Sequence, residues 1–302
     1  MRRSKAFRRT LAALTLVALA LVLVAGHEMF GLLGVISQPR DGCSLAEAMA
    51  GGWHTVETLL HNDVFFLTSR IIDRDPAGYV LWHTAGGDYW APEKDYSLFY
   101  VLAELELEPY GEDRPDVLRG KVVLDCGAHL GVFTRQALAA GAAQVIAIEP
   151  GPPQVYCLRR TFAKENAAGR VRVEAKGVWD REGQLDLASG ADTARSSLTG
   201  LAGGKVVTVP VTTIDRLASD LGLATVGFIK MDIEGAEPQA LAGAARTLHD
   251  ARPRLAIAAY HRPDDQRKIL AAVRLANPLY RSSQIGCRVD LGISVPLTLV
   301  FE

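Results

Sequence analysis

Two acidic residues and two glycines stand where two successive predicted strands end. Asp125 and Gly127 close the stretch "KVVLDCG", Gly131 precedes the helix that follows, and Glu149 ends "VIAIE". Parallel strands end at the same edge of a sheet, which is where open α/β sheets bind ligands. Glu149 can accept hydrogen bonds from both hydroxyls of a ribose. The spacing therefore predicts a nucleotide-like cofactor at this edge.

The glycine turn separates two classes of cofactor. A dinucleotide needs three closely spaced glycines that bring its pyrophosphate to a helix N-terminus, whereas Ala128 stands in place of the middle glycine here. The Asp125 carboxylate would repel a pyrophosphate, but it can accept from the ammonium group of S-adenosylmethionine. We therefore expect S-adenosylmethionine, with an NAD-dependent oxidoreductase as the alternative. The glycines of the turn could also serve only to pack a helix closely on the sheet.

A second group of ionisable residues follows two later strands. "FIKMDIEGAE" places Asp232 at the end of one strand and Glu234 just beyond it, and His261 follows "PRLAIAAY", the next strand. Methyl transfer from S-adenosylmethionine to an acceptor that must lose a proton needs a general base within hydrogen-bond reach. All three residues are candidates, and we favour His261 because its unperturbed pKa of about 6.5 suits proton removal. A structural role, capping the helix near Asp264, is the alternative for His261.

Neighbouring residues have simpler expected roles. Glu237 is expected to cap the helix that begins near Pro238, because acids favour that end of a helix. Ser196 and Ser197 in "TARSSLTG" belong to a solvated turn or line the substrate mouth. The carboxylates of Asp232 and Glu234 and the imidazole of His261 are acceptable ligands for magnesium or manganese. Their spacing is not a recognised metal signature, so no metal site is assigned and a divalent ion remains an open alternative.

The elements that must position these residues alternate between strand and helix from residue 121 onward. This pattern predicts an α/β fold with a mostly parallel, doubly wound sheet and helices on both faces. A further strand-like stretch, "KVVTVPV", lies in an insertion before the fourth strand, and "YSLFYVLAELELE" predicts a helix that covers one edge of the core. Strands are expected at "VVLD", "QVIAIE", "VRVEA", "VGFIKMD" and "PRLAIAAY", and helices at 132–140, 152–166, 237–248 and 264–275.

Composition limits the function classes. The chain has 302 residues, 49% of them apolar, and a formal net charge of −1. Five positive charges lie within residues 2–9, so the rest of the chain carries −6. A body without a basic excess argues against a nucleic-acid substrate. The four cysteines show no metal or disulfide spacing, so we expect reduced thiols, with Cys126 and Cys157 buried in the core.

The N-terminus predicts a membrane-associated helix. Residues 11–26 are uncharged and apolar, and continuing to Ile36 makes the segment long enough to cross a bilayer. We favour an uncleaved anchor over a cleavable signal peptide. The basic head would stay in the cytoplasm and send the following chain across the membrane, although the expected cofactor is made in the cytoplasm. A cytoplasmic or an exported location therefore remains an alternative.

Several blocks together carry a family resemblance. "VVLDCGAHLGVFTRQAL", "VIAIEP", "TTIDRL", "VGFIKMDIEGAEPQALAGA" and "YHRPDD" resemble, in order and spacing, the FkbM-type S-adenosylmethionine-dependent methyltransferases over about residues 80–300. The resemblance implies a Rossmann-like class I methyltransferase fold and O-methylation of a hydroxyl on a small molecule or glycan. Ala128 and His129 would join the cofactor contacts, although His129 stands where an asparagine is usual in the family.

The resemblance and the polar turn "GEDRPD" together divide the chain into three parts. Residues 1–36 form the basic head and hydrophobic anchor or signal-like segment, and residues 37–115 form an extension that covers the core. Residues 116–302 form the methyltransferase domain. The remaining alternative is a non-catalytic, membrane-tethered module that keeps only the fold.

Overall fold

The computed structural model describes residues 42–107, 110–111, 116–189, 197–199, 205–290 and 293–302. The segment expected to anchor the chain in a membrane lies outside these residues. Within the described part of the chain, no helix is both long enough and apolar enough to cross a bilayer.

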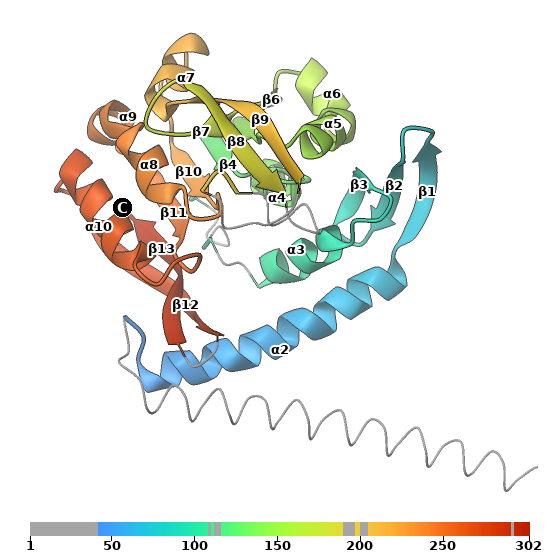
Figure 1. The fold of residues 1–302 in the computed structure, drawn as a ribbon, viewed down its shortest axis with the longest axis horizontal. Helices are drawn as coiled ribbons and strands as arrows, with labels where there is room; N and C mark the ends of the chain where they lie inside the picture. The colour runs from blue at the N-terminus through green and yellow to red at the C-terminus, as the bar shows by residue number, and fades with distance from the viewer. Residues whose placement is uncertain (1–41, 108–109, 112–115, 190–196, 200–204, 291–292) are drawn as a thin grey trace, which may run out of the picture.

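A seven-stranded sheet forms the centre of the molecule, in the order β12-β13-β11-β10-β4-β5-β6 (Figure 1). Neighbouring strands from β11 to β6 run parallel, whereas β13 runs antiparallel to both β11 and β12. All five strands expected from the sequence are present. The strands span Val122–Cys126 (β4), Gln144–Ile148 (β5), Val171–Glu174 (β6), Phe228–Met231 (β10), Arg254–Ala258 (β11), Ser282–Asp290 (β12) and Ile293–Phe301 (β13).

Helices cover both faces of this sheet, as the sequence predicted. Successive residues of β4 point to opposite faces: Val123 packs with Phe133 of α4, and Leu124 packs with Ile269 of α10. Strands buried on both faces explain why the sequence shows continuous apolar runs there. The helices are α4 (Val132–Ala139), α5 (Pro152–Thr161), α6 (Ala163–Ala167), α7 (Ile214–Asp220), α8 (Glu237–Ala242), α9 (Ala245–Asp250) and α10 (Asp265–Ala276).

Two helices expected as single segments are each divided in two. The stretch 152–166 breaks at Phe162, and the stretch 237–248 breaks at Gly243 and Ala244. At Gly243 a Cβ atom would lie 2.1 Å from the carbonyl oxygen of Trp179. The break therefore lets the chain pass close to the backbone of Trp179, a contact with a distant segment that helical periodicity does not reveal.

The expected insertion forms a small second sheet. Gly177–Val178 (β7), Gly183–Ser189 (β8) and Lys205–Thr212 (β9) pair in the order β7-β9-β8. The stretch "KVVTVPV" is therefore a strand, as predicted. Leu187 and Val178 from this sheet reach the large cavity described below.

Within residues 42–107, the extension forms two helices and a three-stranded antiparallel meander. Trp82 and Phe99 of the extension belong to the same apolar core as Phe133 and Phe228 of the central sheet and its helix. The extension thus shares a core with the rest of the chain. Its elements are α2 (Leu45–Thr68), β1 (Arg70–Asp75), β2 (Tyr79–Thr84), β3 (Gly87–Pro92) and α3 (Ser97–Glu106).

The long helix α2 runs beneath α3 from the edge strand β12 to the meander (Figure 1). A capping box begins it: Ser44 Oγ accepts from the Glu47 N–H, and Glu47 Oε2 accepts from the Ser44 N–H. At Gly51 a Cβ atom would lie 1.8 Å from the carbonyl oxygen of Cys287. A glycine is therefore required where α2 crosses β12.

A disulfide joins Cys43, just before α2, to Cys287 in β12. The expectation that all cysteines are reduced was wrong for this pair, because 244 residues separate the two positions and no local spacing reveals such a pairing. Cys126 and Cys157 are free and buried, as expected. The disulfide fixes the start of α2 against the edge of the central sheet.

A thiol titration checks this pairing. We expect no thiol to react in the native protein, because Cys126 and Cys157 are buried. Two thiols should react in guanidinium chloride without reductant, and four after reduction. Four reactive thiols in the unreduced, unfolded protein would show that Cys43 and Cys287 are not bonded.

The turn after β4 places two glycines against neighbouring structure. Gly127 has a φ of +79°, and a Cβ atom there would lie 1.9 Å from the carbonyl oxygen of Asp232. Gly131 has a φ of +88°, and its Cβ would lie 2.3 Å from the Phe162 ring. Both positions need glycine for conformation and for close packing. The packing role that the sequence left open is therefore real for both residues.

Replacing Gly127 by alanine should destabilise the fold itself. The matched control is Gly169→Ala, where φ is +72° and nothing lies within 4 Å of the added carbon. In both variants an alanine must adopt a left-handed backbone conformation, which costs about 1–2 kcal/mol. Only in Gly127→Ala does the added carbon also collide with the backbone of Asp232, at the end of β10. Chemical denaturation should show Gly127→Ala to be about 1–3 kcal/mol less stable than the control. Equal stabilities would mean that the two backbones are not in contact.

Candidate functional site

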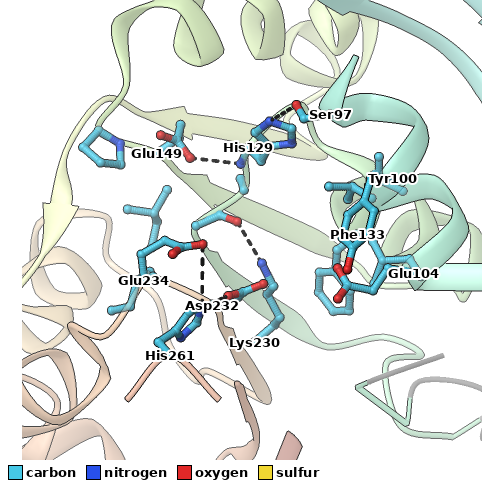
Figure 2. Close-up of a pocket in the computed structure, with 18 of the residues that line it drawn as sticks. Ser97, Tyr100, Glu104, His129, Phe133, Glu149, Lys230, Asp232, Glu234 and His261 are labelled. Carbon is cyan, nitrogen blue, oxygen red and sulfur yellow. Dashed lines mark hydrogen bonds and ion pairs between the residues drawn. The ribbon is translucent and has the colours of Figure 1, made fainter. Parts of the chain in front are cut away.

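A cavity of about 800 Å³ opens at the carboxyl ends of β4, β5, β10 and β11. One wall comes from the central sheet and its turns, with Glu149, Lys230 and Asp232 (Figure 2). The facing wall comes from α3, with Tyr100 and Glu104. The position is the one where open α/β sheets bind ligands.

Glu149 lies in the cavity wall, where the sequence placed it. Its Oε1 accepts from the Gly151 N–H at 2.8 Å, and its Oε2 accepts from the His129 N–H at 3.0 Å. Burial raises the pKa of this carboxyl to about 7, although the two backbone N–H groups act in the opposite direction. Each carboxylate oxygen keeps a further lone pair, so Glu149 can still accept hydrogen bonds from a ligand.

The N–H groups of the glycine turn are used within the protein. Gly127 and Ala128 both donate to the Ile148 carbonyl, and His129 donates to Glu149. The turn therefore holds the end of β5 in place and does not offer these donors to a ligand. Gly127 and Ala128 line the cavity, whereas Gly131 is not among the lining residues.

His129 is a non-glycine residue with a φ of +50°. Its Nε2 lies 3.1 Å from Ser97 Oγ at the start of α3 (Figure 2). Its side chain therefore joins the cofactor-side turn to the extension. His129 lines the cavity, but its imidazole already has a partner on the opposite wall.

Asp125 does not line the cavity. Its side chain is fully buried, with Oδ2 accepting from Thr134 Oγ1 at 2.6 Å and Oδ1 at 3.3 Å from Lys230 Nζ. Lys230 Nζ also donates to the Gly127 carbonyl at 2.8 Å. The direct contact with a cofactor ammonium that the sequence suggested for Asp125 is not supported, because Thr134 and Lys230 already occupy its carboxylate. The sequence could not show that a lysine from β10 reaches the end of β4.

Asp232 points into the cavity between two hydrogen-bond donors. Its Oδ2 accepts from Tyr110 Oη at 2.8 Å, and its Oδ1 lies 3.2 Å from His261 Nε2. Burial alone would raise its pKa, but His261 and Lys230 outweigh burial and hold the pKa well below its usual range. Asp232 is therefore an ionised carboxylate at neutral pH.

His261 reaches the same edge as Asp232, as predicted, and its surroundings are strongly acidic. Its Nε2 lies 3.6 Å from Glu234 Oε1, and its Nδ1 lies 3.3 Å from Glu237 Oε1. Burial lowers its pKa, but the contacts with Asp232, Glu234 and Glu237 prevail and raise it well above the ordinary value. His261 is therefore an imidazolium at neutral pH. Because a proton acceptor needs the neutral ring, these contacts argue against His261 as the general base, and that role stays a prediction.

Glu234 is held in a left-handed conformation, with a φ of +56°. The hydroxyls of Ser197 and Thr199 donate to its carbonyl at 3.0 and 3.1 Å. Ser197 is thus buried and positions Glu234, and it does not line the substrate mouth. Ser196 lies outside the described residues.

Glu237 is the first residue of α8 and is fully buried. Its Oε1 accepts from the N–H of Ile233, which lies in the turn before the helix. The carboxylate therefore bonds to this turn and not to an N–H group of α8, as a helix cap would. Asp232, Glu237 and His261 are close enough to ligate a metal ion, and they are the one such group within the described residues. The imidazolium of His261 already supplies a positive charge to these carboxylates, and a divalent ion remains the alternative.

Glu104 is the functional candidate that the sequence did not indicate. It lies on α3, in the wall opposite Glu234 (Figure 2). Burial, reinforced by the Asp232 carboxylate, raises its pKa to about 7. In the sequence "ELELE", Glu104 looks like an ordinary polar residue of an amphipathic helix. Only the packing of α3 over the sheet brings it to the site.

A protein-family model matches the part of the chain that contains Glu149, Asp232 and His261. The model of the methyltransferase FkbM domain matches residues 125–280, just over half of the chain. No match is found among curated proteins.

Two of the similar solved structures are methyltransferases. The methyltransferase FkbM from Methylobacillus flagellatus KT is 25% identical over 68% of this chain, with a TM-score of 0.46, and the match spans only 54% of that protein's length. Magnesium protoporphyrin IX methyltransferase from Synechocystis, solved with bound SAM, is 14% identical over 68% of this chain and 83% of its own, with a TM-score of 0.41.

The family assignment rests on the domain match, which covers the turn after β4, Glu149, Asp232 and His261. The sheet around these residues is the Rossmann-like sheet that the resemblance implied. This chain therefore belongs to the FkbM methyltransferase family.

Proposed function

We propose that this protein is an S-adenosylmethionine-dependent methyltransferase that O-methylates a hydroxyl of a small molecule or glycan. The observation that carries the proposal is the position of Glu149, a cavity-lining carboxylate at the end of the second strand of a family domain. Residues 116–302 would supply the cofactor side of the site. Residues 37–115 would supply most of the acceptor side, through α3.

The residues present fit the cofactor. The cavity volume of about 800 Å³ is within the range of cofactor and substrate sites. Glu149 would accept from the ribose hydroxyls, with Ala128 and His129 beside it. When bound, the cofactor supplies an electrophilic methyl group on a positively charged sulfur. The ionised Asp232 at the same edge supplies a negative charge that suits such a cation.

The acceptor side combines aromatic rings with carboxylates. Tyr96, Tyr100, Tyr110 and Tyr260 line the cavity together with Glu104. Aromatic faces pack against the apolar faces of a sugar or a polyketide, and carboxylates accept from hydroxyl groups. This composition supports a hydroxyl-bearing acceptor.

The acceptor hydroxyl must lose a proton as its oxygen gains the methyl group. Asp232 has a lowered pKa and His261 is already protonated, so neither is a good proton acceptor. Glu104 has a pKa of about 7, the range in which a general base works best at neutral pH. We therefore assign proton removal to Glu104 and the positioning of the acceptor to Asp232. His261 and Glu234 would act on the acceptor through Asp232.

Replacing Glu149 by glutamine should weaken cofactor binding. The variant keeps the shape of the side chain but loses its charge, so binding of S-adenosylmethionine should weaken by about 1–3 kcal/mol. Titration calorimetry with S-adenosylmethionine, S-adenosylhomocysteine and NAD measures this. The control is Glu174→Gln, at the end of the neighbouring strand, where the carboxylate pairs with Arg172. An unchanged affinity for Glu149→Gln would exclude the ribose role, and wild-type binding of NAD alone would favour an oxidoreductase.

Replacing Glu104 by glutamine should lower kcat by about 10²–10⁴, the usual contribution of a general base. A base works only when unprotonated, so in the wild type kcat at saturating cofactor should rise with pH up to about 7 and then level off. The variant should lose this rise. Glu106→Gln, on the same helix but exposed beside His61, is the control.

The same pH profiles test the role first expected of His261. If Glu104→Gln keeps normal turnover and the rise with pH, while His261→Gln loses both, then His261 is the base after all. If Asp232→Asn alone abolishes turnover, then Asp232 takes the proton.

A further inference from the structure

One face of α2 is apolar and exposed. Met49, Trp53, Leu60, Val64 and Leu67 are 53, 70, 60, 57 and 79% exposed, and their spacing places them on one side of the helix. We call these five residues the α2 apolar face. Among the described residues, seven of the thirteen exposed large apolar side chains lie on α2, so the exposure is concentrated there.

The opposite face of α2 is already packed. Ala48, Gly51 and Thr58 are buried on that side, where the helix meets β12 and α3. A helix that is apolar on both faces is normally buried on both. A soluble monomer rarely exposes a continuous apolar surface of this kind. We therefore expect another apolar surface to cover the α2 apolar face.

The chain that enters α2 has the composition and length of such an occupant. Residues 11–36 comprise 26 residues with a single charged side chain, Glu28, and α2 has 24 residues. As helices they would measure about 39 and 36 Å. Residues 37–44 connect them, a length typical of the connection between two antiparallel helices. The disulfide at Cys43 fixes the point from which the preceding chain must leave.

Charge favours the antiparallel arrangement as well. If residues 11–36 run antiparallel to α2, the basic head, residues 2–9, lies at the carboxyl end of α2, where the last turn carries no basic residue. The carboxyl end of a helix attracts cations. Asp63 and Asp73 are exposed in the same region.

We propose that residues 11–36 form a helix that packs antiparallel on the α2 apolar face, as an intramolecular layer of the fold. The segment then completes the extension, and the hydrophobicity that suggested a membrane anchor serves the packing of α2. This proposal is independent of the proposed enzymatic function. A lipid bilayer and a second copy of the chain are the competing occupants.

Cysteine cross-linking in the full-length protein tests the proposal. Leu60→Cys is combined with a single cysteine at each position from 17 to 24 in turn, and each double variant is oxidised and analysed on non-reducing gels and by intact mass. We expect intramolecular cross-links that recur every three or four positions, because one side of the segment faces α2. The matched control replaces Leu60→Cys with Leu275→Cys, on the exposed side of α10, and should give none.

Three results would overturn the proposal. Cross-linked dimers would place a second copy on the α2 apolar face. A full-length protein that sediments with membranes and forms no cross-link would place the segment in the bilayer. A soluble protein without cross-links would leave the segment away from α2. Thermal melts give a second reading: Leu60→Asp should lower the Tm by several degrees at any protein concentration, whereas Leu275→Asp should not.

Discussion

The buried ammonium of Lys230 is the interaction on which the candidate site depends. Its Nζ reaches the Asp125 carboxylate and the Gly127 carbonyl, so it ties β10 to the turn after β4. Burial lowers the pKa of Lys230, but Asp125 and Asp232 outweigh burial and raise it. The lysine is therefore charged, and its positive charge helps to hold the pKa of the Asp232 carboxyl below its usual range. With this tie in place, Gly127 packs on the backbone of Asp232 and fixes where that residue points.

From this point the charges alternate across the floor of the cavity. Lys230 and His261 flank Asp232, and His261 in turn contacts Glu234 and Glu237. Lys230 and His261 stabilise the ionised form of Asp232, and the three carboxylates stabilise the protonated form of His261. Glu104 lies across the cavity, and the positive charges near it do not offset burial, which raises its pKa to about 7. The same site therefore contains a permanently ionised carboxylate and one that can exchange a proton.

The sequence predicts the central sheet well because its signals are local. Apolar runs of five residues, Pro152 at a helix start and Gly141 after a helix end all act over a few positions. The position of Glu149 follows from the same logic, because it depends only on where β5 ends. The pairing of Cys43 with Cys287 and the reach of Lys230 to Asp125 depend on distant segments, and no local pattern reveals them. Glu104 was missed because its role depends on how α3 packs. The contact between Glu237 and His261 was missed because Glu237 reaches the histidine only through the tight turn that follows Asp232.

The central claim is that the cavity edged by Glu149 and Asp232 holds the cofactor. A crystal structure of the protein with S-adenosylhomocysteine tests it most directly. We expect the ligand in that cavity, with its ribose in contact with Glu149 and with Asp125 still bound to Lys230. A ligand bound elsewhere, or one that displaces Lys230 from Asp125, would contradict it.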